Sequence, residues 1–310
     1  MRHGRRRTRS TIAWGTVTLV AASCLLSASS IASPGRPEGP MPTAEPLTRS
    51  PALAPTKPSE SPQIQFGAMA SAPVAASRTS FAHRDVAAAV GALFQLTDAG
   101  TLDNHFCTAS VVDSPHGDLV LTAAHCVAGR DPATLAFVPA YFNGDVPYGI
   151  WRVTQVFVDS QWSSSASEDD DFAFLAVSGP VAGAAPSANA GVPSGQALED
   201  LTGGEVLAAT VRPTDQRVRV IGYPNASDVP ISCVNGVKAF TSTQLEFDCD
   251  GYTGGTSGSP FIVAGPGGTM AVMGVIGGYQ QGGDLPEVSY ASEFGARLTA
   301  LYKAAVGSGG

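Results

Sequence analysis

Short apolar runs alternate with clusters of turn-forming residues along the chain from about residue 85 onward. The runs are rich in β-branched and aromatic residues, and Trp151–Val158 shows the period of two that is typical of a half-buried strand. The first half predicts strands at Val90–Leu96, Phe106–Val112, Leu119–Thr122, Leu135–Val138, Trp151–Val158 and Asp171–Val177. The second half predicts strands at Val206–Val211, Val218–Tyr223, Val237–Phe240, Gln244–Phe247, Phe261–Val263 and Met270–Ile276.

A segment rich in Gly, Ala, Pro and Ser, Val181–Gly204, separates these two groups and predicts a long connector. Only the C-terminus has a clear helical pattern. Phe294, Leu298 and Leu301 follow the spacing i, i+4, i+7 after Ser292, a favoured N-cap residue type. The pattern therefore predicts an all-β fold with two β-barrels side by side, at about 86–180 and 205–290, and a C-terminal helix at about 292–305.

The first 84 residues have a different texture. A basic region with five arginines is followed by the mostly apolar Ile12–Leu26 and then by small residues. This order predicts a secretory signal peptide over residues 1–32, cleaved near Ala32. A membrane anchor is the alternative, but this run is shorter than the roughly 20 residues needed to span a bilayer. A twin-arginine signal at Arg5-Arg6 and a lipid-modified Cys24 are weaker alternatives.

Residues 33–84 are rich in Pro, Ala and Ser, and ten of the 23 prolines lie between Pro34 and Pro73. The segment has no hydrophobic periodicity, so it cannot bury enough apolar area to offset its chain entropy. We expect a disordered propeptide or tether, followed by a folded domain over residues 85–310.

Composition and charge narrow the function classes. The chain is 44% hydrophobic and 14% charged, which excludes a wholly disordered chain and a coiled coil. Residues 85–310 hold 8 basic and 23 acidic side chains, a net charge of −15. An acidic surface repels phosphate backbones, so nucleic acid is excluded as a partner.

Four cysteines remain after removal of the signal peptide, and an even number in an exported chain predicts disulfides. Three connectivities are possible, and proximity in the sequence favours Cys107–Cys126 and Cys233–Cys249. Zinc binding is the runner-up, but the chain has no C-x-x-C pair and no paired histidines. We expect no metal and no cofactor.

The folded region holds three histidines, the side chain most often used as a general base near neutral pH. His116 lies in a predicted turn and is expected to be solvated, whereas His105 precedes a cysteine and a strand and is expected to be structural. His125 ends an apolar strand beside Cys126, which would hold its imidazole rigidly. His125 is therefore the candidate base.

Two further segments carry candidate chemistry. Gly254–Pro260 places glycines on both sides of Ser257, so the amides of Gly255 and Ser257 could converge on an oxyanion, although an ordinary Gly-Ser loop is the alternative. Asp171 opens an apolar strand, where a buried carboxylate can accept a histidine N–H. The preceding Glu168–Asp170 is expected to be a solvated acidic loop, with a calcium site as a weaker alternative.

Together these motifs resemble the chymotrypsin-like (trypsin-like) serine proteases. The resemblance rests on Thr-Ala-Ala-His-Cys ending at Cys126, Asp-Phe-Ala-Phe-Leu from Asp171, and Gly-Thr-Ser-Gly-Ser-Pro around Ser257, and covers about residues 90–305. It implies two antiparallel six-stranded β-barrels and a secreted endopeptidase that acts on polypeptides. It also implies that Ser257 is the nucleophile, His125 the base and Asp171 its partner, with Gly255 and Ser257 forming the oxyanion hole.

The sequence departs from the digestive members of that family at two places. Thr256 replaces the aspartate that receives the new N-terminal ammonium on activation, and Gly251 stands where trypsin-type pockets have an aspartate. The motif around Ser257 and Gly222-Tyr223-Pro224 look more like the bacterial glutamyl-endopeptidase branch. The pocket candidates, which include no histidine to support a strict glutamate preference, are Gly251, Tyr252, Thr253, Gly277, Gly278 and Tyr279.

The sequence allows alternative roles for the pocket residues and for the whole protein. Gly277 and Gly278 are expected to pair with substrate as a strand edge, while Tyr252 and Tyr279 either line the pocket or pack the barrel. The leading hypothesis is a secreted, extracellular, monomeric serine endopeptidase with no stable membrane association, made as a zymogen with a mature chain beginning near residue 85. The alternatives are a catalytically silent protease-like binding protein and a cell-surface protein tethered by residues 33–84.

Overall fold

The computed structural model describes residues 41–47, 86–180, 195–208 and 216–308. The predicted signal peptide and most of the predicted connector lie outside these ranges. No helix among the described residues has the length and apolar character needed to cross a bilayer.

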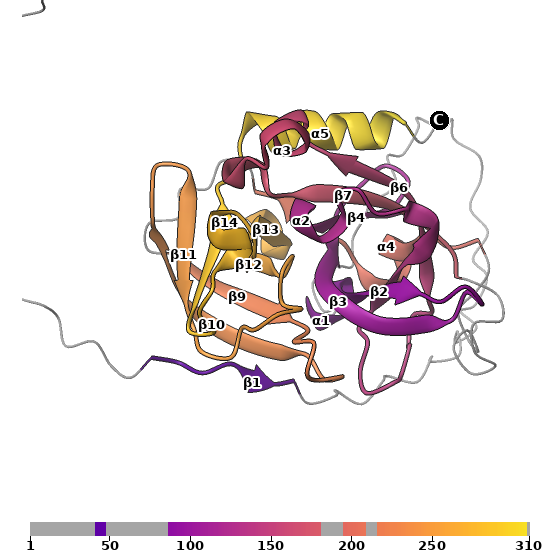
Figure 1. The fold of residues 1–310 in the computed structure, drawn as a ribbon, viewed down its shortest axis with the longest axis horizontal. Helices are drawn as coiled ribbons and strands as arrows, with labels where there is room; N and C mark the ends of the chain where they lie inside the picture. Colours follow the sequence, from indigo (N-terminus) through magenta and orange to yellow (C-terminus); the bar gives the residue numbers. More distant parts are fainter. Residues whose placement is uncertain (1–40, 48–85, 181–194, 209–215, 309–310) are drawn as a thin grey trace, which may run out of the picture. The chain divides into compact units, whose positions relative to one another are not determined.

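Six antiparallel strands of the first half form a closed barrel, in the order β2-β3-β4-β7-β6-β5 (Figure 1). They are β2 (Val90–Leu96), β3 (Leu102–Val111), β4 (Leu119–Thr122), β5 (Leu135–Pro139), β6 (Trp151–Val158) and β7 (Ala173–Ser178). The prediction of six strands here is confirmed, and the bounds of β2, β4 and β6 match the sequence pattern. Alternating side chains fill the barrel interior around Leu93, Phe137, Trp151 and Leu175.

The second half forms a sheet with the strand order β14-β11-β10-β9-β12-β13-β8. Its strands are β8 (Val206–Leu207), β9 (Arg217–Gly222), β10 (Ile231–Ala239), β11 (Gln244–Asp248), β12 (Pro260–Ala264), β13 (Met270–Val275) and β14 (Val288–Ser292). Within the described residues no ladder joins β13 to β14, so this half is a sheet and its closure as a barrel is not confirmed. One hydrogen bond, from Gly277 N to Tyr290 O at 3.0 Å, connects the chain just beyond β13 with β14. The sequence pattern missed β14 because Val288–Ser292 holds few strongly apolar residues.

Most helices are single turns between strands. They are α1 (Val86–Ala89), α2 (Ala124–Val127), α3 (Ser160–Ser165) and α4 (Leu198–Thr202), with the 3-10 turns η2 (Pro132–Thr134), η3 (Glu168–Asp170), η4 (Pro266–Gly268) and η5 (Tyr279–Gly282). The C-terminal helix α5 (Ala296–Gly307) begins later than predicted, because Ser292 is the last residue of β14 and Gly295 is the N-cap. Its Leu298 and Ala305 pack with Phe172 and Phe174 at β7.

An apolar cluster joins the two halves. Val90, Phe94 and Val138 from the first barrel pack against Ile221 and Ile262 of the second sheet. These side chains are almost fully buried, so the contact holds the two halves as one hydrophobic interface. The segment that follows β4, the turn that precedes β7 and the loop that follows β13 are thereby fixed relative to one another.

Both expected disulfides are present. Cys107–Cys126 links β3 to α2 with a Cα–Cα distance of 6.2 Å, and Cys233–Cys249 links β10 to the end of β11 with a distance of 6.7 Å. The connectivity favoured by sequence proximity is therefore confirmed.

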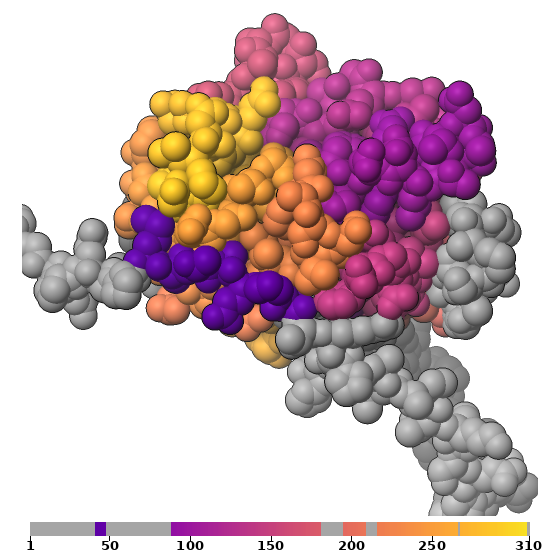
Figure 2. Space-filling view, turned by 60° about the horizontal axis from the view of Figure 1, so that its bottom comes forward, coloured from indigo at the N-terminus to yellow at the C-terminus, as the bar shows by residue number. Residues whose placement is uncertain are grey.

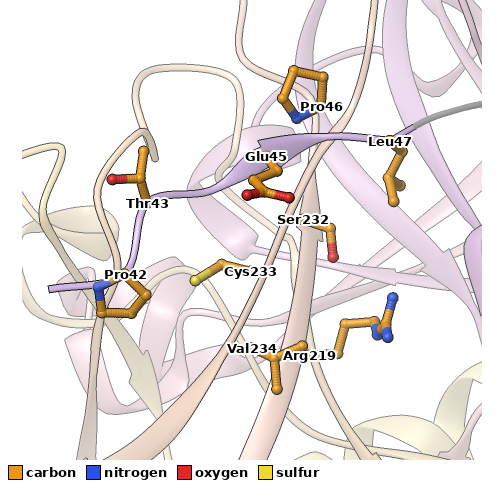
Figure 3. Close-up of a pocket in the computed structure, with 9 residues that line it drawn as sticks. All are labelled: Pro42, Thr43, Glu45, Pro46, Leu47, Arg219, Ser232, Cys233 and Val234. Carbon is orange, nitrogen blue, oxygen red and sulfur yellow. The ribbon is translucent and has the colours of Figure 1, made fainter. Parts of the chain in front are cut away.

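A short strand lies inside the range that was expected to be disordered. In β1 (Glu45–Pro46), Glu45 pairs with Ser232 and Pro46 with Ile231 of β10, and Ala44 N donates to Asp250 O at 2.8 Å. Figure 2 shows this segment, in indigo, on the orange surface of the second sheet. Figure 3 shows the pocket between them, whose lining includes Arg219. The expectation of disorder is therefore wrong for residues 41–47. Composition could not reveal this strand because backbone pairing at an exposed strand edge requires no apolar pattern.

Glu205 is a buried acid in the connection between the two halves. It is 2% exposed, and among the described residues neither of its carboxyl oxygens has a hydrogen bond. Desolvation raises the pKa of Glu205 to about 8, an effect that the nearby Ser110 hydroxyl only partly opposes. Because the unfolded chain releases this proton at a lower pH than the folded chain, the free energy of unfolding falls as pH rises from about 4.5 to 8.

We therefore expect Glu205→Gln to stabilise the protein at alkaline pH. The gain in unfolding free energy at pH 8 should be on the order of 4 kcal/mol, and it should vanish below the ordinary glutamate pKa. Urea unfolding of both proteins at pH 4 and pH 8 measures this difference. A gain of the same size at both pH values would show that Glu205 does not carry the pH dependence.

Candidate active site

The register of the first barrel places His125 beside Asp171. Thr122, the last residue of β4, pairs with Ala173, the first residue of β7, so the chain leaving β4 meets the chain entering β7. His125 lies in α2, three residues after Thr122, and Asp171 lies two residues before Ala173. His125 Nδ1 is 2.8 Å from Asp171 Oδ2, and His125 N donates to Asp171 Oδ1 at 2.9 Å.

The Asp171 carboxylate receives one more backbone donor from the second half. Gly278 N donates to Asp171 Oδ2 at 2.9 Å, and the Asp171 side chain is fully buried. The close approach needs glycine at position 277, because a Cβ there would lie 3.0 Å from both the carbonyl oxygen and Oδ2 of Asp171. Three N–H groups thus hold the carboxylate in one orientation, in which it fixes the imidazole of His125.

Ser257 lies in a tight loop that is closed by hydrogen bonds within the loop itself. Thr256 N donates to Thr253 O at 3.1 Å, and Thr256 Oγ1 donates to the same oxygen at 2.8 Å. Ser259 N and Ser259 Oγ both donate to Thr256 O, at 3.0 and 2.6 Å. These bonds leave Ser257 partly exposed at the tip of the loop. Thr256 is thus held by hydrogen bonds to its own loop.

Two glycines allow this loop to approach its surroundings. Gly255 and Gly258 have φ values of 98° and 83°, which disfavour residues with a side chain. A Cβ at Gly258 would clash with the carbonyl oxygen of Thr108 and with Thr122 at the end of β4. The Ser257 loop therefore packs directly on the strand that leads into His125.

Asn225 holds the peptide group that carries the Gly255 N–H of the predicted oxyanion hole, and Thr108 holds the carbonyl groups of the neighbouring peptides. Asn225 N donates to Gly254 O at 2.7 Å, and because a trans peptide points its C=O and N–H in opposite directions, the Gly255 N–H faces away from Asn225. Thr108 Oγ1 donates to Gly255 O at 3.0 Å, and Thr108 N donates to Ser257 O at 2.8 Å. Thr108 Oγ1 also accepts from Tyr223 N at 2.9 Å. Thr108 is fully buried, so it braces this loop from the first barrel.

The pocket candidates have different environments. Tyr252 is 5% exposed, packs with Phe247 in the core of the second sheet and donates from its hydroxyl to Val220 O at 2.8 Å. Burial accordingly raises the pKa of Tyr252. Of the two alternatives predicted for Tyr252, lining the pocket or packing the barrel, its position agrees with the second. Tyr279 is half-buried and packs at a tilt against the ring of Phe240 and edge-to-face against that of Tyr290, with centroids 5.0 and 5.1 Å apart.

The remaining pocket candidates, one threonine and three glycines, contribute mainly backbone groups. Thr253 is exposed and supplies its carbonyl to Thr256, while Gly251 has a φ of 106° and faces Ala44 of the segment before β1. Gly277 and Gly278 lie against Asp171.

The acidic run is only partly the solvated loop that was predicted, because Glu168 and Asp169 are exposed but all three side chains accept hydrogen bonds. Asp170 is 4% exposed and accepts from Ser167 Oγ at 2.7 Å and from Arg297 Nε at 2.6 Å. Asp169 Oδ1 accepts from Gln244 Nε2 at 2.7 Å, and Glu168 Oε1 accepts from Gln280 N at 3.0 Å. Apart from Ser167, these partners lie 75 to 127 residues away in the sequence, so local composition could not reveal them.

The other two histidines occupy the expected environments. His105 is buried against Phe94, Tyr141 and Tyr223, and desolvation lowers the pKa of His105. His116 is exposed in its turn. Among the described residues, one group of three potential metal ligands occurs, formed by Cys107, His125 and Cys126. Both cysteines are joined in a disulfide, so this group offers no thiolate to a metal.

A family model described as the trypsin-like peptidase domain matches residues 107–265, which is more than half of the chain. The chain therefore belongs to the trypsin-like peptidase family, and it is a serine-type endopeptidase, a hydrolase. A comparison with curated proteins finds no match.

Solved structures share the fold. The protease Anisep from Arthrobacter nicotinovorans has a TM-score of 0.56 and 23% identity, with 72% of this chain and 98% of that chain covered. A thermostable serine protease, AL20, from an extremophilic microorganism has a TM-score of 0.55 and 23% identity, with coverage of 72% and 98%. A Glu endopeptidase in complex with MPD has a TM-score of 0.52 and 14% identity, with coverage of 71% and 91%. These likenesses establish the fold.

Proposed function

We propose that the chain is a secreted serine endopeptidase that hydrolyses peptide bonds through an acyl-enzyme on Ser257. The observation that carries this proposal is the paired arrangement of His125 and Asp171 at 2.8 Å beside the loop that presents Ser257. A buried carboxylate holding an imidazole next to a partly exposed serine is the arrangement that activates a serine hydroxyl.

In the proposed reaction each of the named groups has a separate role. Ser257 Oγ bonds to the scissile carbonyl carbon while its proton passes to Nε2 of His125, and Asp171 stabilises the resulting imidazolium. The amides of Gly255 and Ser257 bind the developing oxyanion, and each such donor is worth about 10²–10³ in kcat. The imidazolium returns its proton to the leaving amine, and water then releases the acyl group by the same steps in reverse.

Several finer features belong to the same proposal. Residues 1–32 act as a secretion signal, residues 33–84 as a prosegment or tether, and residues 85–310 as the protease domain. Two disulfides are typical of exported proteins and support secretion. Strands β9 to β14 serve as the second six-stranded barrel of the family, and the Gly277–Tyr290 hydrogen bond between its two ends supports this assignment.

The proposed specificity pocket has no carboxylate at the position that would bind a basic side chain of the substrate. Gly251 offers no carboxylate to an arginine or lysine side chain, so we propose that the enzyme does not require a basic residue before the cleaved bond. Tyr279 and its aromatic neighbours Phe240 and Tyr290 supply an apolar wall near the site instead.

Labelling with a fluorophosphonate probe tests the proposed nucleophile. The secreted full-length protein is treated with the probe, and the modified peptide is mapped by mass spectrometry. We expect an adduct on Ser257, no adduct in Ser257→Ala, and normal labelling in Ser165→Ala, which alters an exposed serine of α3. A folded wild-type protein that does not react would favour the catalytically silent alternative and overturn the proposal.

A further inference from the structure

Gln244, the first residue of β11, lies between the acidic turn and the loop that follows β13. It is 4% exposed, yet both ends of its amide are used. Its Oε1 accepts from Tyr279 N at 3.2 Å, and its Nε2 donates to Asp169 Oδ1 at 2.7 Å. A buried side-chain amide with both partners in place has one preferred orientation, because rotating it would oppose like groups.

This contact is the central one of three in succession. Gly278 N donates to Asp171 Oδ2 at 2.9 Å, Tyr279 N to Gln244 Oε1 at 3.2 Å, and Gln280 N to the Glu168 carboxylate at 3.0 Å. Three consecutive amides are thus received by three side chains. Two of the acceptors, and the aspartate behind Gln244, come from the run 168–171 that carries the predicted catalytic carboxylate.

The loop needs such support because its backbone is strained. Gln280 and Gln281 have φ values of 52° and 56°, in the left-handed region that costs residues with a side chain about 1–3 kcal/mol each. Gly278 has a φ of 76°, and a Cβ there would clash with Gln244 Oε1. A conformation of this kind persists only where its surroundings determine it.

We propose that Gln244, backed by Asp169, is a positioning residue that holds the loop 277–281 at the edge of the active site in the geometry that extended peptide substrates require. The inference rests on the proposed function. Among the described residues Gln244 forms no hydrogen bond with Ser257 or His125, so its effect on catalysis passes through the loop.

The same contacts restrict how a substrate can pair with this loop. Each of the amides of residues 278–280 already donates within the protein, so a substrate main chain meets no free N–H there while the contacts persist. Pairing along this edge then depends on substrate N–H groups and carbonyl oxygens of the loop. The predicted pairing of substrate with the strand edge at Gly277 and Gly278 is thereby limited to carbonyl acceptors of the loop at Gly278.

The variant Gln244→Glu tests the proposal. It retains an acceptor for Tyr279 N but places its second carboxylate oxygen against Asp169 instead of a donor. We expect KM for an extended peptide substrate to rise roughly 10-fold, which corresponds to the loss of one buried hydrogen bond. The rate of fluorophosphonate labelling of Ser257 should change by less than about 3-fold, since the small probe does not reach along the loop.

Adding Asp169→Asn to that variant should restore the contact with the donor and acceptor exchanged. In the double variant the asparagine amide donates to the new glutamate, and KM for the extended peptide should return to within about 3-fold of the wild-type value. Gln161→Glu, an exposed position on α3, is the matched control and should leave both readouts unchanged.

Should Gln244→Glu fail to fold, Glu168→Ala provides an independent measurement at an exposed position, where it removes the acceptor of Gln280 N. A rise in KM of about 3-fold for the extended peptide, with normal probe labelling, is expected. Unchanged peptide kinetics in a folded Gln244→Glu protein, or equal losses of peptide turnover and probe labelling without rescue, would overturn the inference. Failure of the wild-type protein to label would instead overturn the proposed function.

Discussion

Asparagine in place of Asp171 is expected to lower kcat by about 10⁴-fold without unfolding the protein. Asp171 accepts three N–H groups, from His125 N, His125 Nδ1 and Gly278 N. A carboxamide has only one oxygen, so its NH₂ group must oppose one of these donors or become a donor to the imidazole. In the second case His125 adopts the tautomer protonated at Nε2 and can no longer take the proton of Ser257.

Steady-state hydrolysis of a peptide ester by the purified Asp171→Asn protein measures this loss. Asp170→Asn is the matched control, because Asp170 is the neighbouring buried carboxylate but contacts Ser167 and Arg297 instead of the imidazole. The control should retain kcat within about 10-fold. Equal losses in the two variants would mean that the acidic turn as a whole, and not the Asp171–His125 contact, supports turnover.

Valine in place of Thr108 is expected to reduce kcat by on the order of 10²-fold, because the loop that carries Ser257 would shift. The substitution keeps the shape of the side chain but removes the hydroxyl that donates to Gly255 O and accepts from Tyr223 N. The peptide that joins Gly255 to Thr256, which lies between the two proposed oxyanion-hole amides, then loses a contact that sets its orientation. Two buried backbone groups also lose a partner, so the free energy of unfolding should fall by about 2 kcal/mol.

The comparison of turnover with stability separates these two effects. Thr154→Val is the matched control, since Thr154 Oγ1 donates to the backbone of Ala176 at an exposed position of β6. The control should change neither kcat nor the rate of probe labelling. A Thr108→Val protein with lower thermal stability but wild-type kcat below its melting temperature would limit Thr108 to a structural role.

The sequence predicted the elements whose determinants are local. The strands of the first barrel followed from apolar runs bounded by turns. Short motifs selected His125, Asp171 and Ser257, and the structure places the first two in contact, while their catalytic roles stay predictions. The disulfide connectivity followed from proximity, because each pair is separated by fewer than 20 residues. In these cases the interacting groups are neighbours in the chain or belong to one motif.

The residues that hold the loops of the candidate active site in place could not be predicted in this way. Thr108 and Gln244 are ordinary polar residues of strands until the other half of the chain packs on them, 147 residues away for Thr108 and Gly255. Asn225 acts through its backbone amide, which carries no residue-type signature. The hydrogen-bond partners of the acidic run include Gln280 and Arg297, which lie 112 and 127 residues later in the sequence, so the polar composition of the run did not reveal them. Long-range hydrogen bonds of this kind become visible only in three dimensions.

The strand β1 changes what removal of the N-terminal region would entail. β11 pairs with only the last residues of β10, Val237–Ala239, whereas β1 pairs with Ile231 and Ser232 at its start. Trimming the chain near residue 85 and losing residues 41–47 would leave that stretch with unpaired backbone groups, a template onto which another extended chain can add. Truncated molecules would thus associate with one another, and with unfolded polypeptides, more readily than molecules that keep β1.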